Sequence, residues 1–386
     1  MNEKFIPLSV PSFQGNELKY VSNCIETEWV STAGEYVDRF EKEFARYVGS
    51  KYAVACSNGT AALHISLILA GVSSEDEVII PTVTFIAPVN TIRYIDASPI
   101  FMDCDEYLNI DVEKTKIFCE EECHFNGTYL INKKSGKKVK AIIPVHIFGH
   151  PVRIDELMKL SKKYNLKIIE DSTESLGSYY TKGDFKDKKT GTIGDLGCFS
   201  FNGNKIITTG GGGMLVTDNK EFAEKAKYLT TQAKDDPVYY VHNEVGYNYR
   251  MTNLQAALGV AQLEKIEKYI EIKRKNFILY KEAIDNIEGL SLIDEPEYAF
   301  SNFWMYSLVV EEEKYGKNRD ELLKALSEAK IQTRPLWKLN HTQKPFEIFE
   351  ALDMENSEKT YKKILNIPCS VNIREEDITR ITGVLK

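Results

Sequence analysis

Apolar residues recur at helical spacing in two segments near the start of the chain, residues 15–27 and 35–47. In the first segment, Leu18, Val21 and Ile25 fall on one face of a helix. Apolar positions three or four residues apart are typical of a helix that buries one side. We therefore expect two surface helices before the first strand.

Short runs rich in β-forming residues then alternate with helical stretches. The runs cover residues 52–56, 77–81, 99–103, 141–144, 167–170, 197–201 and 213–217. This alternation predicts an α/β fold with a large, mostly parallel sheet and helices on both of its faces. Ligands of such sheets bind beyond the carboxyl ends of the strands.

A helical pattern rich in Leu, Ala, Glu and Lys runs from residue 253 to residue 287. Beyond it, strands are expected at residues 303–310 and 332–335, around a helix at residues 319–329. We therefore predict two domains. Residues 1–255 would hold the N-terminal helices and the large α/β domain, and residues 256–386 the long helix and a small α+β domain.

The composition narrows the classes of partner. The formal net charge of -8 would repel a phosphate backbone, so nucleic acid is not an expected partner. The sequence shows neither a signal peptide nor a run of about 20 apolar residues that could cross a membrane. The 7 cysteines are scattered and odd in number, which favours reduced thiols. We expect a cytoplasmic protein that does not bind membranes.

The first motif with chemical meaning is SNGTAA at residues 57–62, where a strand ends and a helix begins. The start of a helix offers free backbone N–H groups and the positive end of the dipole, and both suit a phosphate group. The alternative is an ordinary capped helix.

The second motif is IIED at residues 168–171, an apolar strand that ends in two carboxylates. A carboxylate there could hold a protonated pyridine nitrogen and make the ring an electron sink. The alternative is that Asp171 caps the next helix.

The third motif is GCFSFNGNK at residues 197–205, in which a strand leads through turn-forming residues to a lysine. Ser200 could donate a hydroxyl to phosphate, and the turn could present the amine of Lys205 to a site. A lysine acts as a nucleophile only after losing its proton, which burial near other cations promotes. The alternative is a solvated surface lysine.

The fourth motif is GYNYRMTNLQAA at residues 246–257, a polar and aromatic cluster that opens the long helix. Its alternative reading is a helix cap with core tyrosines. Taken on their chemistry alone, the four motifs indicate an enzyme with an α/β sheet that binds a phosphate-bearing ligand.

Together and in this order, the four motifs resemble those of the DegT/DnrJ/EryC1/StrS family of sugar aminotransferases. The resemblance covers nearly the whole chain. It implies the fold of type I pyridoxal 5′-phosphate (PLP) enzymes, which is like that of aspartate aminotransferase. Within the family, residues 29–34, 202–205 and 230–236 are similar to the aminotransferases of the legionaminic acid and bacillosamine pathways.

The resemblance also implies roles for individual residues. Lys205 would hold PLP as a Schiff base and move the proton, Asp171 would bind the pyridine nitrogen, and Phe85 would stack on the ring. The residues expected at the phosphate are Gly59, Thr60, Ala61 and Ser200, together with Asn248 from a second subunit. The enzyme would therefore be a homodimer with shared active sites.

One position departs from the family pattern, because many members carry Gln where this chain has Glu174. In the family, the side chain at this position is expected to contact the ring oxygen of the cofactor, and the change from Gln to Glu affects that expected contact. For the sugar nucleotide, the expected binding residues are Thr32, Arg250, Arg334 and His341.

The implied reaction moves the amino group of L-glutamate to C4 of a UDP- or GDP-linked 4-keto-6-deoxy-N-acetylhexosamine, for bacterial amino-sugar and surface-glycan biosynthesis. The alternatives are a 3-keto sugar aminotransferase, a PLP-dependent sugar dehydratase and a non-catalytic regulator that binds PLP or a nucleotide sugar. Relatives that dehydrate have histidine where Lys205 stands, which favours transamination. A metal site at Cys119, Cys123 and His124 is not expected, because their spacing is loose.

Overall fold

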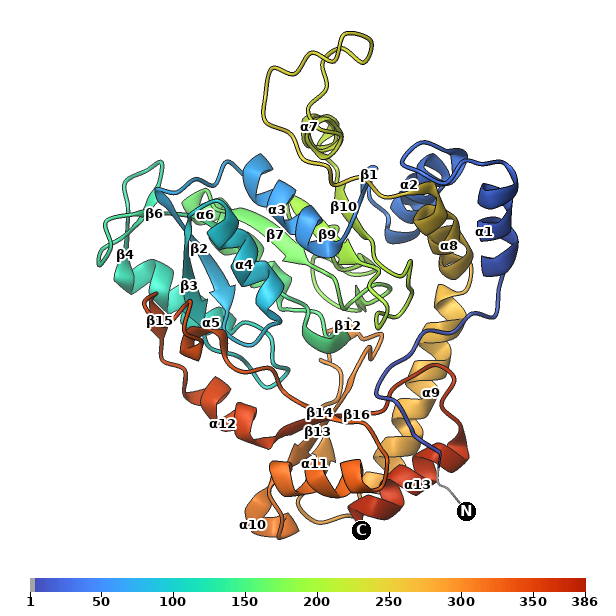
Figure 1. The fold of residues 1–386 in the computed structure, drawn as a ribbon. Helices are drawn as coiled ribbons and strands as arrows, with labels where there is room; N and C mark the ends of the chain where they lie inside the picture. Colours follow the sequence, from blue (N-terminus) through green and yellow to red (C-terminus); the bar gives the residue numbers. More distant parts are fainter. Residues whose placement is uncertain (1–3) are drawn as a thin grey trace.

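The computed structural model describes residues 4–386, and its largest feature is a sheet of ten strands (Figure 1). The main path of this sheet is β1 (Tyr52–Cys56), β10 (Gly213–Thr217), β9 (Leu196–Ser200), β7 (Lys167–Asp171), β6 (Lys138–Ile142), β2 (Asp76–Pro81), β3 (Ser98–Met102) and β15 (Ala351–Leu352). The hairpin β4 (Cys123–Phe125) and β5 (Leu130–Asn132) pairs beside β6. The mostly parallel sheet expected from the sequence is confirmed, with β10 antiparallel to both of its neighbours.

Helices cover both faces of this sheet. In chain order, the helices of this part are α1 (Glu17–Glu26), α2 (Glu35–Val48), α3 (Gly59–Leu69), α4 (Ile86–Tyr94), α5 (Val112–Ile117), α6 (Ile154–Tyr164) and α7 (Lys220–Thr230). Of these, α2, α3, α4, α6 and α7 pack directly on strands of the sheet. Successive strand residues enter two separate apolar cores: Ile169 packs in the core under α3, and Ile168 in the core under α6. Side chains alternate across a strand, so a strand buried on both faces is apolar throughout.

The predicted long helix is two helices, α8 (Asn253–Leu263) and α9 (Ile266–Ile284). The break lies at Glu264, whose carboxylate accepts hydrogen bonds from Asn16 and from Tyr20 of α1. These contacts fix the junction to a segment distant in sequence. The apolar periodicity of the sequence runs through the junction without interruption. The prediction of one long helix was therefore wrong.

A second, antiparallel sheet lies in the C-terminal part of the chain. Its order is β11 (Leu290–Leu292), β13 (Tyr306–Val310), β16 (Ile364–Ile367) and β14 (Arg334–Pro335). The helices of this part are α10 (Glu312–Tyr315), α11 (Arg319–Glu328), α12 (Glu355–Lys363) and α13 (Glu375–Leu385), and β12 (Ala299–Phe300) pairs with β8 (Tyr179–Tyr180).

The chain crosses between these two parts more than once. β15 returns to the large sheet beside β3, and Ile6 forms a bridge with Ile331. The domain boundary near residue 255 stays a prediction, and these two contacts cross it.

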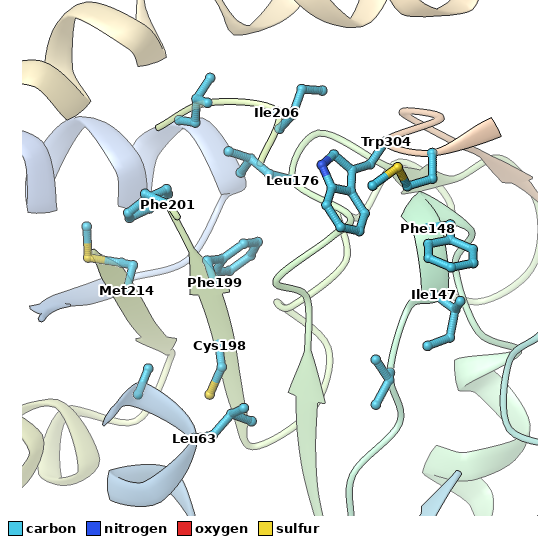
Figure 2. Close-up of a cluster of buried hydrophobic side chains, with 14 of the residues drawn as sticks. Leu63, Ile147, Phe148, Leu176, Cys198, Phe199, Phe201, Ile206, Met214 and Trp304 are labelled. Carbon is cyan, nitrogen blue, oxygen red and sulfur yellow. The ribbon is translucent and has the colours of Figure 1, made fainter. Parts of the chain in front are cut away.

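An aromatic cluster supports the end of β9, which leads to the lysine motif. Phe199 of β9 and Phe201, which follows the strand (both labelled in Figure 2), lie 5.0 and 5.4 Å, centroid to centroid, from Phe44 of α2. Both rings are buried. Buried aromatic pairs at this spacing hold their strand rigidly, so the polar residues that follow β9 begin from a fixed position.

Candidate active site

A cavity of about 780 Å³ opens at the carboxyl ends of the parallel strands. From the large sheet and its connections it is lined by Asn58, Gly59, Thr60, Thr84, Phe85, Val145, Phe148, Asp171, Thr173, Glu174, Ser200 and Lys205. From the C-terminal part it is lined by Trp304, Met305, Arg334, Leu336, Trp337 and Lys338. Three of the four sequence motifs therefore meet at one cavity, at the end of the sheet where ligands bind.

Asp171 is the last residue of β7 and lies in the cavity wall, almost fully buried at 2% exposure. The Thr173 amide donates a hydrogen bond to its Oδ1 at 3.1 Å. Burial raises the pKa of Asp171, although Thr173 and the Lys205 ammonium act in the opposite direction. A buried carboxylate with so few partners is suited to a cationic ring nitrogen.

The neighbouring carboxylate of Glu170 points to the other face of β7, because side chains alternate along a strand. It is held by the amides of Gly191, Ile193 and Gly194 and by the Nε2 of His146 at 3.1 Å. The Nδ1 of His146 accepts from the Val152 amide, so Nε2 carries the proton. Glu170 is thus a structural group, and of the two acidic residues at this strand end only Asp171 lines the cavity.

Lys205 lies in the loop after β9 and enters the cavity with only 13% of its side chain exposed. Its Nζ is 3.4 Å from the Oε1 of Glu174 and 4.0 Å from the centre of the Trp304 ring. Trp304 in turn donates its Nε1–H to the Asn204 carbonyl at 2.8 Å. The amine is therefore placed by an acid on one side and an indole on the other.

The start of α3 forms another part of the cavity wall. The Asn58 side chain caps this helix by accepting a hydrogen bond from the Ala61 amide at 2.8 Å. Ala61 was predicted to bind the phosphate, and its amide is already used by this cap. Within residues 4–386, the amides of Gly59 and Thr60 have no protein acceptor. A Cβ at Gly59 would lie 2.9 Å from the Cβ of Ser200. This cradle of open amides, a hydroxyl and a glycine suits a phosphate group.

Aromatic residues that the motifs did not indicate form much of the remaining wall. Phe148 and Trp337 lie 4.8 Å apart, and Phe85, which is 53% exposed, lies 6.1 Å from Trp337. Only Phe85 among them was predicted. Trp304 lies in a segment that was expected to be a strand, residues 303–310, and Trp337 lies just beyond the one expected at residues 332–335. An aromatic residue in a strand carries no local sign that it faces a ligand.

Two residues of the fourth motif lie outside the cavity lining. Asn248 is exposed in the segment that pairs with Thr231, and Arg250 bonds through Nη2 to the Gln232 side chain at 3.3 Å. The motif still lies next to the start of α3, because the Tyr249 carbonyl accepts the Ser57 amide at 2.7 Å.

The predicted sugar-nucleotide residues are spread over the molecule. Arg334 lines the cavity, is exposed, and donates to the Thr333 carbonyl. Thr32 is half-buried in the loop between α1 and α2, and His341 pairs through Nδ1 with the Thr82 hydroxyl at 2.7 Å. Thr32 and His341 do not line the cavity formed by the described residues.

These residues fit PLP. The cavity holds a buried carboxylate for the ring nitrogen, a lysine beside it, and an open helix start for the phosphate. For a metal, the structure offers nothing comparable: among residues 4–386, no three or more His, Cys, Asp or Glu side chains are grouped to hold an ion. In the same range, no helix is long and apolar enough to cross a bilayer.

Comparison with known proteins agrees with this geometry. Residues 11–386 match the DegT/DnrJ/EryC1/StrS aminotransferase family. The chain belongs to this family. GDP-perosamine synthase from Caulobacter vibrioides is 35% identical over 384 residues, which are 98% of this chain and 97% of that protein. GDP-perosamine synthase from Escherichia coli O157:H7 is 39% identical over 339 residues, 88% of this chain and 86% of that protein.

A solved structure supports the same assignment. The aminotransferase from Psychrobacter cryohalolentis matches with a TM-score of 0.86 at 26% identity, over 99% of this chain and 98% of that one. As a member of the DegT/DnrJ/EryC1/StrS family, the protein is a PLP-dependent sugar aminotransferase of the type I fold. The family, fold, enzyme class and cofactor expected from the sequence are thereby confirmed.

Proposed function

We propose that the enzyme moves the amino group of L-glutamate to C4 of a GDP-linked 4-keto-6-deoxy hexose, for amino-sugar and surface-glycan biosynthesis. The observation that carries the proposal is the buried Lys205 amine, which lines one cavity with Asp171, Glu174 and the open start of α3. A lysine in this place favours amine transfer over the dehydratase.

PLP supplies the electron sink for breaking and forming bonds at the carbon that carries nitrogen. The chain supplies position and protons. Asp171 holds the ring nitrogen in its protonated state, and the amides of Gly59 and Thr60 with the Ser200 hydroxyl bind the phosphate. Lys205 moves the proton at the reacting carbon, and Trp304 and Phe148 keep water from that region of the cavity.

The choice of GDP over UDP rests on the relatives. Two that align over most of this chain are named GDP-perosamine synthase, a name that gives GDP as the carrier of the sugar. At the cavity, Arg334 and Lys338 provide exposed cations for a diphosphate. An N-acetyl group on the hexose, and the link to legionaminic acid or bacillosamine, stay predictions from the sequence.

The active form is proposed to be a homodimer in which Asn248 reaches the phosphate of the partner's cofactor. Asn248 is exposed on the segment after α7, which extends away from the sheet (Figure 1). That segment also exposes apolar side chains: Val238 at 73%, Tyr239 at 81% and Val245 at 82%. Exposed apolar residues so close together are typical of a protein interface.

Sedimentation velocity tests the dimer. Tyr239→Glu with Val245→Glu should yield monomers that keep their fold and lose PLP affinity. Ile348→Glu is a matched control, because Ile348 is 81% exposed on a different segment. Full activity in a verified monomer would contradict the shared site. The cytoplasmic location stays a proposal as well, and it is supported by seven cysteines that are all free and buried.

The function is tested by absorbance and product analysis on PLP-loaded protein. L-Glutamate should deplete the long-wavelength band of lysine-bound PLP in the wild type, and Lys205→Ala should lack that band. GDP- and UDP-linked 4-keto-6-deoxy sugars are then offered separately. An amino sugar formed from the GDP compound supports the proposal. Loss of a hydroxyl without gain of nitrogen would indicate the dehydratase, and no turnover would indicate the regulator.

A further inference from the structure

Residues 6–10 form a strap that crosses from the C-terminal part of the chain to the candidate active site. At positions 6, 8 and 10, the backbone makes hydrogen bonds of 2.8–3.0 Å to residues 330–332 and 369–370. Bonding at every second residue is typical of an extended chain, in which alternate residues face the same neighbour. The strap is thus fixed beside β14 and β16 of the second sheet.

Ser9, near the middle of the strap, contacts the loop that carries Lys205. Its hydroxyl donates a hydrogen bond to the Asn204 carbonyl at 3.1 Å. The indole Nε1–H of Trp304 donates to the same carbonyl at 2.8 Å. Asn204 comes directly before Lys205, and Leu8 of the strap lines the cavity. Two donors that are distant in sequence therefore meet at the residue before the lysine.

The loop, residues 202–207, has few other supports on the N-terminal side of Lys205. Asn202 and Asn204 are exposed, and a Cβ at Gly203 would meet nothing within 4 Å. The Lys205 amide bonds back to the Asn202 carbonyl at 3.0 Å, which is a contact within the loop. Within the described part of the chain, the Asn204 carbonyl is the one backbone group after Asn202 in this loop that bonds outside it.

On the C-terminal side of the lysine, packing holds the loop instead. Ile206 and Ile207 are both buried in the larger apolar core (Ile206 is labelled in Figure 2). Lys205 therefore lies between a packed half of the loop and a half that depends on one carbonyl. The orientation of its amine follows from how firmly that carbonyl is held.

The place of the amine matters because the Nζ of Lys205 is 3.4 Å from the Oε1 of Glu174 and 4.0 Å from the centre of the Trp304 ring. A misplacement of about 1 Å in a reacting group can slow a reaction by about a hundredfold. We propose that Ser9 is a positioning residue, which acts through the Asn204 carbonyl to keep the Lys205 amine in this place. The inference rests on the proposed function, in which this amine moves the proton.

The indole N–H signals of the full-length, PLP-loaded protein test the contact without any substrate. The chain has 3 tryptophans, so spectra of isotope-labelled indoles contain few signals, and Trp304→Phe identifies the one from Trp304. In Ser9→Ala this N–H should exchange with solvent about fivefold faster, because its acceptor has lost a second hydrogen bond. Ser9→Thr keeps the hydroxyl and should restore the wild-type exchange rate.

Ser50→Ala is a matched control. Ser50 is half-buried like Ser9, and its hydroxyl also donates to a backbone carbonyl, that of Tyr52 at 3.2 Å. It does not line the cavity formed by the described residues. Ser50→Ala should therefore leave both the indole exchange rate and the reaction with L-glutamate as they are in the wild type.

The reaction with L-glutamate alone separates positioning from a merely structural role. At saturating L-glutamate, Ser9→Ala should deplete the lysine-bound PLP band about fivefold more slowly, with nearly the same KM, because only the amine is misplaced. Ser9→Ala combined with Trp304→Phe removes both donors. The double variant should be slower than the product of the two single effects predicts, because both donors hold one carbonyl.

Two results would overturn the proposal: an unchanged indole exchange rate in Ser9→Ala, or faster exchange with an unchanged reaction rate. A wild type whose PLP band does not respond to L-glutamate would contradict the proposed function instead. The exchange rates would then still decide whether Ser9 fixes the loop, since they require neither L-glutamate nor a sugar.

Discussion

The Nζ of Lys205 lies 4.0 Å from the centre of the indole ring of Trp304. The two residues are almost a hundred positions apart in the sequence. The same indole donates its Nε1–H to the Asn204 carbonyl at 2.8 Å. Trp304 therefore both covers the lysine and holds the loop that carries it. The C-terminal part of the chain therefore contacts the lysine to which the proposed function assigns the proton transfer.

Substitutions at Trp304 should separate these two effects. Trp304→Phe keeps a ring over Lys205 but loses the hydrogen bond, which should cost about 1 kcal/mol in unfolding free energy. Trp304→Ala removes a residue that is 3% exposed and should cost about 3–5 kcal/mol and weaken PLP binding. Urea unfolding and PLP titration measure both. Wild-type PLP affinity in Trp304→Ala would contradict a positioning role.

The adjacent carboxylates of β7 should respond differently to loss of charge. Asp171→Asn should lower kcat by about a hundredfold or more, the size typical of losing one preorganised electrostatic contact. Glu170→Gln puts an N–H donor where a carboxylate oxygen accepts backbone N–H groups outside the cavity, and should lower stability by about 1–3 kcal/mol. Measuring kcat and the urea midpoint of both variants distinguishes an effect on catalysis from an effect on stability. Equal effects on kcat at similar stability would contradict the assignment.

The phosphate cradle should not tolerate a side chain at Gly59. Gly59→Ala places a Cβ 2.9 Å from that of Ser200, and the Kd for PLP should rise about tenfold, or about 1.4 kcal/mol. Gly383→Ala in α13 is the control, because its Cβ would meet nothing within 4 Å. That helix should gain up to about 1 kcal/mol without any change in PLP affinity. Unchanged affinity in Gly59→Ala would place the phosphate elsewhere.

His150 should make the protein lose stability in mild acid. Burial lowers its pKa to about 4, and its Nδ1 has no hydrogen-bond partner among the residues that the structure describes. An unfolded histidine has a pKa of about 6.5, so the unfolded state binds the proton first as the pH falls. Stability should therefore fall between about pH 6.5 and about pH 4, by about 3 kcal/mol at most.

His150→Leu should remove that part of the pH dependence. Urea midpoints of the wild type and the variant at about pH 7 and about pH 5 measure the difference. The wild type should lose more stability than the variant over this interval. Parallel curves would mean that His150 is solvated or paired at low pH.

Local patterns predicted much of the fold. Ile168 and Ile169 are consecutive apolar residues because β7 is buried on both faces, and that pattern is visible without coordinates. The Asn58 cap marks the start of α3 in the same way. The break at Glu264 was not visible in the apolar pattern, and the partners of its carboxylate, Asn16 and Tyr20, lie 248 and 244 residues away in the sequence.

The features of the candidate active site also divide into those that the sequence predicted and those that only the structure showed. The sequence by itself determined the strand ends, the helix start and the lysine, since each is a local arrangement of residue types. Only the tertiary structure decided that Asp171 faces the cavity while Glu170 does not, that Trp304 covers Lys205, and that Phe148 anchors Glu174. Those relationships depend on strand register and long-range packing, which no short window of sequence encodes.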